Sequence, residues 1–302
     1  MSEHATLGEY LNLSLPSRAE DKPRDTGLTM VMDQGWPADF VAGMLEQFGR
    51  YLDIVKLWDP QLLSPVAAVR RKIDIYRSYG VRVQPGGLFM EIAKKQGKDR
   101  DLVKHFVDLG FDMVEISSTT STRTEMSADL EMVTYAKANG LTVVGEVGRK
   151  FADGDETRLT EDTIDIETTV REFKELLDAG AWKVYWEGHL LRQVLGDDPE
   201  MIKQHAATGT AQVREVARIV GESNIMFEAS GLRPRANRQW LQFWLVRLFG
   251  PDVNIANARI EELANLEAIR RGNHPIHGFG SAGNYPWVRA MGDGGSGTWW
   301  RT

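Results

Sequence analysis

Cysteine is absent from this sequence of 302 residues. The chain therefore has no disulfide framework, no thiolate nucleophile and no cysteine-bound metal. Any metal that it binds should be a hard cation on oxygen ligands, Mg²⁺ before zinc or iron. The six histidines form no H-E-x-x-H or H-x-E pattern, so a metal held by imidazole is not expected either.

Long apolar runs are also missing. No run approaches the roughly 18–20 residues that cross a bilayer, and the first residues, MSEHATLGEY, lack the basic and apolar regions of a signal peptide. The formal net charge of -7 disfavours nucleic acid and anionic membranes as partners, because both bind basic surfaces. We expect a cytoplasmic protein that acts on a small molecule.

Signature motifs of several enzyme classes are missing as well. The sequence shows no G-x-G-x-x-G turn after its first strand-like run, no P-loop and no G-x-S-x-G elbow. Hydrophobic residues make up 42% of the chain and charged residues 26%, as in an ordinary globular protein. The length is still within the range of a single α/β barrel domain.

Short apolar runs of strand type recur along the chain, and most are followed by helical spacing. We count eight such runs: Leu28–Asp33, Leu52–Leu57, Val81–Pro85, Met113–Ile116, Leu141–Glu146, Trp182–Glu187, Ile225–Glu228 and Val253–Ile255. Helices are predicted at Pro65–Tyr79, Glu125–Asn139, Ile166–Ala179 and Gln212–Val220, the last three closed by Gly140, Gly180 and Gly221. Eight β-then-α units over about 240 residues predict a single (β/α)₈ TIM barrel, with a doubly wound open sheet as the alternative.

Three regions are expected on this basis. Residues 1–26 form an N-terminal arm that packs late or not at all, residues 27–272 the barrel, and residues 273–302 an irregular C-terminal tail rich in glycine and aromatic residues. The helix at Arg238–Phe249 has almost no polar face and must be covered on both sides. The arm or the tail could cover it, but a second subunit is the favoured explanation, so we expect a homo-oligomer.

Acidic residues stand where four successive strands stop. They are Glu115, Glu146, Glu187 and Glu228. A single carboxylate at a strand end is usually a helix cap, but four on one rim repel each other unless cations lie between them. We therefore expect two or three of them to hold Mg²⁺.

Basic and small residues share that rim. Lys56 ends the second strand, Arg149 and Lys150 follow the fifth, and the loops after the last two strands, where barrels often bind phosphate, contain further candidates. The predicted substrate-binding residues are Asp33, Gly86, Gly87, Ser117, Ser230, Arg233 and Asn257. Carboxylates for a metal beside cations for a small anion indicate enolate-type chemistry on a phosphorylated acid.

Several fragments together resemble one family. VMDQGWP (31–37), DIVKLW (53–58), VQPGGLFME (83–91), LGFDMVEIS (109–117), GEVGRK (145–150), EG (187–188), FEAS (227–230), NIAN (254–257) and LEAIRRG (266–272) are similar in order and spacing to phosphosulfolactate synthase. Members of that family add sulfite to phosphoenolpyruvate on the route to coenzyme M, and the family also includes heat-stress-associated plant proteins. The resemblance covers most of the predicted barrel.

The resemblance implies a Mg²⁺-dependent carbon–sulfur lyase. In such an enzyme the metal holds the carboxylate of phosphoenolpyruvate, the nucleophile attacks C3, and a lysine returns a proton to C2. Lys150 matches the proton-donor lysine, and the four strand-end glutamates match the acidic positions of the family. Lys56 and Arg149 would serve as catalytic cations that neutralise the substrate's charge.

Two loops depart from the family pattern. After the second strand the family reads close to KFGWGT, whereas this chain has KLWDPQLL with Asp59; after the fourth, EISDGS is replaced by EISSTTSTRTE with Arg123. Both loops would shape the nucleophile pocket. The same barrel chemistry on a different substrate therefore stays open as an alternative, and so does a non-catalytic protein that presents Trp240–Phe249 to a partner.

Overall fold

The computed structural model describes residues 5–13, 18, 21–117, 123–148, 151–152, 155–159, 164–205, 208–229 and 233–272. For residues 123–125, 151–152 and 155–159 the description covers the backbone only.

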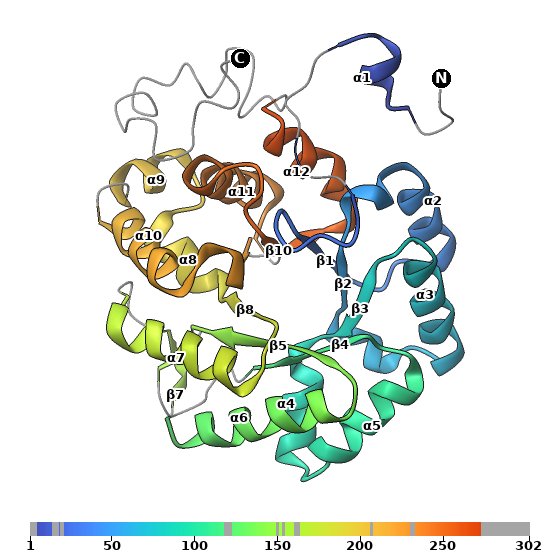
Figure 1. The fold of residues 1–302 in the computed structure, drawn as a ribbon, viewed down its shortest axis with the longest axis vertical. Helices are drawn as coiled ribbons and strands as arrows, with labels where there is room; N and C mark the ends of the chain where they lie inside the picture. The colour runs from blue at the N-terminus through green and yellow to red at the C-terminus, as the bar shows by residue number, and fades with distance from the viewer. Residues whose placement is uncertain are drawn as a thin grey trace.

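Eight parallel strands form one sheet that curves around a common axis (Figure 1). They are β1 (Thr29–Asp33), β2 (Ile54–Leu57), β3 (Arg82–Pro85), β4 (Met113–Ile116), β5 (Thr142–Val147), β8 (Lys183–Trp186), β9 (Ile225–Glu228) and β10 (Ile255–Arg259). The order is β3-β2-β1-β10-β9-β8-β5-β4. At the seam between β3 and β4, Asp112 N donates to Val83 O at 3.0 Å, so the sheet is nearly closed. The predicted barrel is confirmed.

Helices alternate with these strands and surround the sheet (Figure 1). They are α2 (Ala38–Phe48), α3 (Val66–Ser78), α4 (Gly87–Lys95), α5 (Asp99–Leu109), α6 (Arg123–Ala138), α7 (Ile166–Ala179), α8 (Gly188–Leu195), α9 (Pro199–His205), α10 (Gly209–Val220), α11 (Arg235–Phe249) and α12 (Leu263–Arg270). A short α1 (Leu7–Tyr10) precedes the barrel, and β6 (Phe151–Ala152) pairs with β7 (Asp155–Leu159) in the connection after β5. Gly140, Gly180 and Gly221 follow their helices with φ of 92°, 110° and 90°, as the sequence predicted.

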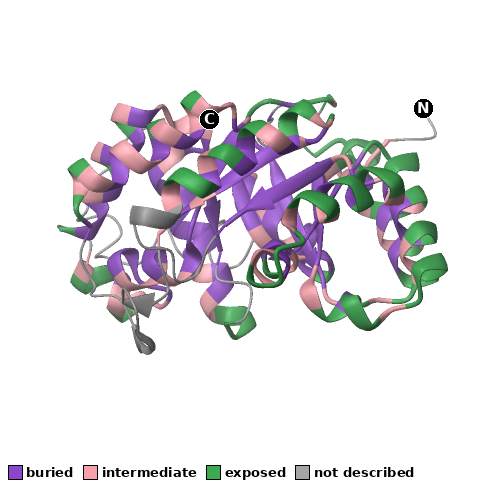
Figure 2. Cartoon of the chain, turned by 90° about the horizontal axis from the view of Figure 1, so that it is seen from below, coloured by how far each residue is buried: buried purple, intermediate pink, exposed green. Residues whose placement is uncertain are grey.

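Strand side chains point alternately into the barrel and out toward the helices. The inner set is Leu28, Met30, Ile54, Met113, Val144, Tyr185, Met226 and Ala256. The outer set packs against the helices and includes Val31, Val55, Val114 and Val184. Figure 2 shows the strands as buried and the exposed residues on the outer faces of the helices. This alternation decides which strand-end side chains can reach the interior.

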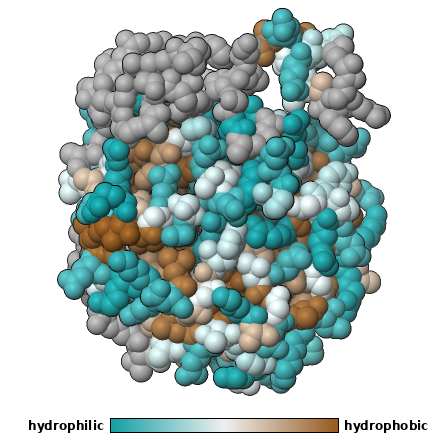
Figure 3. Space-filling model, viewed as in Figure 1, coloured by the Kyte–Doolittle hydropathy of each residue, from teal (hydrophilic) through white to brown (hydrophobic). Residues whose placement is uncertain are grey.

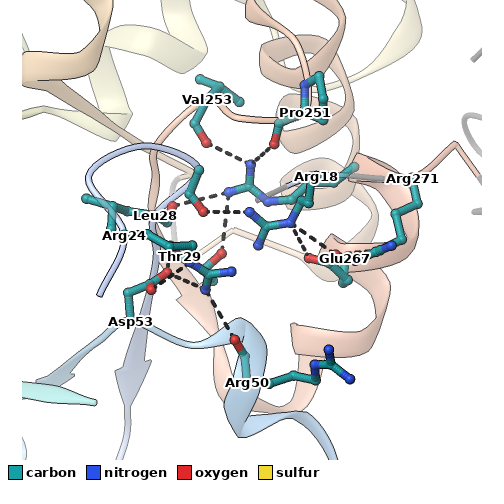
Figure 4. Close-up of polar contacts among 12 residues, drawn as sticks. Arg18, Arg24, Leu28, Thr29, Arg50, Asp53, Pro251, Val253, Glu267 and Arg271 are labelled. Atoms are coloured by element: carbon teal, nitrogen blue, oxygen red, sulfur yellow. Dashed lines mark hydrogen bonds and ion pairs between the residues drawn. The ribbon is translucent and has the colours of Figure 1, made fainter. Parts of the chain in front are cut away.

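The described end of the predicted N-terminal arm packs on the barrel, and the extent of the arm, residues 1–26, stays a prediction. Arg18 and residues 21–27, here called the strap, lie across the N-terminal end of the barrel (Figure 4). Arg18 Nε donates to both carboxylate oxygens of Glu267, at 3.0 and 2.9 Å. Arg24 donates to Asp53 from Nε and Nη2, at 3.0 and 2.8 Å. Both guanidinium groups are buried, so these ion pairs fix the strap to the barrel.

Helix α11 is buried within the single chain. Ten of its residues are buried, the helix packs against α12 and α8, and Phe249 stacks on Phe227 of β9 with 4.8 Å between ring centroids. The apolar surface of Trp240–Phe249 is therefore already covered, and it gives no reason to expect a partner there. The homo-oligomer stays a prediction.

The surface seen in Figure 3 is mostly hydrophilic over the described residues, with hydrophobic residues in smaller patches between. No helix in the described ranges is long and apolar enough to cross a membrane.

Candidate active site

One lysine lies between two glutamates inside the barrel, at the C-terminal ends of the strands. Lys56 Nζ is 2.6 Å from Glu115 Oε2 and 3.4 Å from Glu228 Oε1, and none of the three side chains is more than 6% exposed. Each follows an inner-set residue of its own strand by two positions, which turns it inward. The structure therefore brings together three of the predicted site residues.

The charges of this group are strongly coupled. Burial alone would lower the pKa of Lys56, but Glu115 and Glu228 outweigh it and hold the pKa of Lys56 well above its usual value. Burial raises the pKa of Glu115; Lys56 opposes that rise, while Glu228 and Asp59 add to it. We therefore assign a protonated lysine to the centre of the group.

Gln84 and Tyr185 complete the group, and the sequence reasoning missed both. Tyr185 donates from its hydroxyl to Gln84 Oε1 at 2.9 Å, and Gln84 Nε2 donates to Glu115 Oε2 at 3.1 Å. The ring of Tyr185 lies under the ammonium of Lys56, with Nζ 4.8 Å from the ring centroid. The period-2 pattern holds the signal that could have found them, because each residue has an outward-facing apolar neighbour before it, Val83 or Val184, and therefore points inward.

The other two predicted metal-binding glutamates differ from each other. Glu146 is partly exposed. The largest effects on the pKa of Lys56 are burial, which lowers it, and Glu115, Glu228 and Tyr185, which raise it; the charge of Glu146 adds a smaller rise. Glu187 is buried and its Oε2 accepts from His189 N at 2.6 Å and Leu190 N at 3.1 Å. Glu187 thus caps helix α8, which is the usual role of a carboxylate at such a position.

Two adjacent glycines at the start of α4 lie against acidic side chains. A Cβ at Gly86 would lie 2.2 Å from Asp59 Oδ1, and a Cβ at Gly87 would lie 2.4 Å from both Glu115 Oε1 and Ser117 Oγ. Asp59 belongs to the 3₁₀ helix η2 (Asp59–Leu63) after β2. The departure from the family pattern in this loop therefore places a carboxylate beside the predicted site.

Asp33 is not part of the group around Lys56. Its Oδ1 accepts from Gly35 N (2.8 Å) and Trp36 N (3.0 Å), and its Oδ2 accepts from Lys72 Nζ (2.7 Å) and Tyr76 OH (3.0 Å). The side chain is in phase with the outer set and is fully buried. Its contacts tie β1 to α3, so a direct contact of Asp33 with substrate stays a prediction.

Two of the remaining predicted residues, Arg233 and Asn257, are described and lie apart from the contacts around Lys56. Arg233 Nε donates to the buried Asp197 at 3.0 Å. Asn257 has a left-handed backbone, φ 55°, at an irregular register between β1 and β10, and its buried Oδ1 accepts no hydrogen bond from the described part of the chain. Such strain is typical of functional positions. Arg149, Lys150 and Ser230 lie outside the described residues, as does the side chain of Arg123.

The oxygen donors at this site are of the kind that binds Mg²⁺, if water and substrate complete the coordination of the ion. Among the described residues no three histidine, aspartate or glutamate side chains lie close enough to hold a metal by themselves. Mg²⁺ commonly takes only one or two protein carboxylates and completes its shell with water and substrate oxygens. Glu115 and Glu146 supply donors of that kind on the neighbouring strands β4 and β5, and a Mg²⁺ ion held by them stays a prediction.

Known proteins similar to this chain agree on one family. A profile of the family described as (2R)-phospho-3-sulfolactate synthase (ComA) matches residues 17–275. The phosphosulfolactate synthase of Methanocaldococcus jannaschii is 33% identical over 249 residues, 82% of this chain and 91% of that protein. The phosphosulfolactate synthase of Methanothermobacter thermautotrophicus is 31% identical over 254 residues, 83% of this chain and 91% of that protein.

A solved structure shares the fold alone. The carboxyl transferase domain of Rhizobium etli pyruvate carboxylase matches with a TM-score of 0.51 and 14% identity over 92% of this chain and 46% of that chain. The family match includes the strap, all eight barrel strands and the group around Lys56. This chain therefore belongs to the (2R)-phospho-3-sulfolactate synthase family of enzymes.

Proposed function

We propose that this chain adds sulfite, or a closely related nucleophile, to phosphoenolpyruvate. The observation that carries the proposal is the buried lysine between Glu115 and Glu228, inside the barrel and at the strand ends where such enzymes place their chemistry. The names of the two relatives more than 30% identical to this chain support the reaction type.

The charge of this group supports a need for Mg²⁺. Lys56 carries one positive charge, whereas Glu115, Glu228 and Glu146 are three carboxylates around it. An anionic substrate gains little from a site that is already negative, so further positive charge must accompany it. A bound Mg²⁺ would supply that charge to the substrate carboxylate and to the negative charge that develops there. Lys150 and Arg149 are the protein's own additional cations.

The proposed reaction balances without an oxidant or reductant. The lone pair of sulfite forms the new carbon–sulfur bond at C3, and the electrons of the C2–C3 double bond move toward the carboxylate. Lys150 then delivers a proton to C2, in the role that the family resemblance gives it. The ammonium of Lys56 stabilises negative charge on the substrate during attack, and Glu115 and Glu228 hold that ammonium in place.

The test is direct. Purified protein is mixed with phosphoenolpyruvate, sulfite and Mg²⁺, and the loss of phosphoenolpyruvate and the formation of a sulfonate are followed by phosphorus NMR and mass spectrometry. Lys150→Ala is expected to abolish product formation. Absence of a sulfonate from folded wild-type protein would rule the sulfite reaction out.

Asp59 favours a second candidate, the same addition with a less charged nucleophile. Its carboxylate lies against Gly86 and is close enough to raise the pKa of Glu115, after burial and the neighbouring charges of Lys56 and Glu228. A carboxylate near the site slows the approach of a sulfite dianion. Neutral nucleophiles assayed in place of sulfite separate the two candidates, because only the second predicts that they react faster.

A further inference from the structure

We propose that Gln84 and Tyr185 are positioning residues that hold Glu115 Oε2 on the Lys56 ammonium, so that Oε1 of Glu115 is the oxygen turned toward the substrate. The catalytic role of Glu115 Oε1 rests on the proposed function. The positioning of Glu115 by Gln84 and Tyr185 in the unliganded protein is independent of it.

The direction of the Gln84 side chain follows from its two neighbours. A carboxylate only accepts hydrogen bonds, so the amide nitrogen of Gln84 must face Glu115, 3.1 Å away. The amide oxygen then faces Tyr185, whose hydroxyl donates to it at 2.9 Å. Gln84 and Tyr185 are both fully buried, so water does not compete for these bonds. Tyr185 therefore sets the orientation of Gln84, and Gln84 sets that of Glu115.

The two oxygens of Glu115 consequently have different partners. Oε2 accepts from Lys56 at 2.6 Å and from Gln84 at 3.1 Å. Oε1 lies beside Gly87, and Ser117 Oγ is its donor at 3.4 Å. Hydrogen bonds to a buried carboxylate are among the stronger ones in proteins, so two of them on one oxygen prevent the carboxylate from turning over.

Tyr185 helps to position Lys56 in two ways, through its ring and through its hydroxyl group. Its ring lies 4.8 Å from Lys56 Nζ and attracts the ammonium, while its hydroxyl bonds Gln84. Tyr185→Phe keeps the ring and removes only the hydroxyl. Gln84→Leu removes the amide and keeps a side chain of similar size.

The same barrel offers a matched control. Lys72, Asp33 and Tyr76 form a second buried lysine, carboxylate and tyrosine contact, in which Tyr76 donates to Asp33 Oδ2 at 3.0 Å and Lys72 to the same oxygen at 2.7 Å. Tyr76→Phe removes a buried phenol hydroxyl of the same kind, away from Lys56. It therefore measures what the loss of such a group does to the fold alone.

The first experiment needs no substrate. Buried lysine ammonium groups give ¹⁵N–¹H NMR signals because their hydrogens exchange slowly, and the signals of Lys56 and Lys72 are assigned by their loss in Lys56→Met and Lys72→Met. We expect Tyr185→Phe and Gln84→Leu to shift the Lys56 signal and to speed its hydrogen exchange several-fold, leaving Lys72 unchanged. Tyr76→Phe should do the reverse. An unchanged Lys56 signal in both variants would overturn the proposal.

The second experiment measures turnover with phosphoenolpyruvate and sulfite. Tyr185→Phe and Gln84→Leu are expected to lower kcat about ten-fold with KM within about two-fold, and the double variant should lose no more than the worse single variant, because the two residues act as one unit. Tyr76→Phe should lower thermal stability and leave kcat unchanged. Unchanged kcat in both site variants refutes the catalytic role. Absence of wild-type turnover refutes the proposed function instead, and the NMR result still decides the positioning.

Discussion

Two neighbouring glycines should respond very differently to the same substitution. An alanine Cβ at Gly87 would lie 2.4 Å from Glu115 Oε1 and from Ser117 Oγ, about 1 Å short of the 3.4 Å at which ordinary contact begins. An alanine Cβ at Gly86 would lie 2.2 Å from Asp59 Oδ1. The clash is therefore slightly larger at Gly86. The expected damage is larger at Gly87, because of what each neighbour can do.

We expect Asp59 to yield to a new methyl group more easily than Glu115. Asp59 belongs to the short helix η2 and is partly exposed, so its carboxylate can rotate away from a new methyl group. Glu115 is 4% exposed, and Lys56 and Gln84 hold its Oε2. A methyl group at Gly87 must therefore displace the whole carboxylate by about 1 Å, and a displacement of that size typically costs about 100-fold in rate.

The fold should survive both substitutions. Gly86 has φ −68° and ψ 155°, and Gly87 has no positive φ, so alanine fits the backbone at either position. Alanine in place of glycine within a helix stabilises the fold by about 0.5–1 kcal/mol. Overpacking by the added methyl group destabilises the fold by roughly 1–3 kcal/mol, so the two effects partly cancel. We expect Gly87→Ala to lower the free energy of unfolding by no more than about 2 kcal/mol.

The assay compares kcat/KM for phosphoenolpyruvate and sulfite with the midpoint of urea unfolding. Gly87→Ala should lose about 100-fold in kcat/KM and Gly86→Ala no more than about ten-fold, with both proteins folded. Wild-type kcat/KM in Gly87→Ala, or equal losses in the two variants, would show that the position of Glu115 Oε1 does not matter.

Three further outcomes can be checked. Arg24→Met leaves Asp53 buried without its ion pair, so urea unfolding should show a loss of about 3–5 kcal/mol. Burial raises the pKa of Glu222 from 4.5 to about 7. The folded protein therefore binds this proton more tightly than the unfolded chain, and the free energy of unfolding falls as pH rises between these two values. Glu222→Gln should reduce that fall when unfolding is measured at pH 5 and pH 8. Dialysis against EDTA should abolish turnover and added Mg²⁺ restore it, whereas recovery without any divalent ion would contradict the metal requirement.

Local patterns in the sequence predict the barrel well. The expected runs Met113–Ile116 and Ile225–Glu228 coincide with β4 and β9, and Ile166–Ala179 coincides with α7. Short apolar runs and the glycines that follow helices such as α6, α7 and α10 are short-range features, so a single sequence carries them. The strand ends also predict Lys56, Glu115 and Glu228 as a group, because parallel strands of a barrel end on the same rim.

Long-range pairing explains most of what the sequence reasoning missed. Arg18 and Arg24 stand in a polar segment that looks unpacked, yet their partners Glu267 and Asp53 lie 249 and 29 residues away. The sequence alone did not show what covers helix α11 within the chain, because α8 and α12, which pack on it, are separate segments. Composition within a segment holds no information about such partners.

The two buried lysine, carboxylate and tyrosine contacts show why a strand-end acid cannot be given a role from its position alone. Tyr76 bonds Asp33 directly, and Asp33 accepts two hydrogen bonds on each of its oxygens. Tyr185 reaches Glu115 only through Gln84, and this spares Oε1, whose described donor is Ser117 at 3.4 Å. Asp33 is in phase with the outer set and Glu115 with the inner set. A one-residue difference in phase therefore separates a carboxylate that braces β1 against α3 from one that lies beside Lys56 inside the barrel.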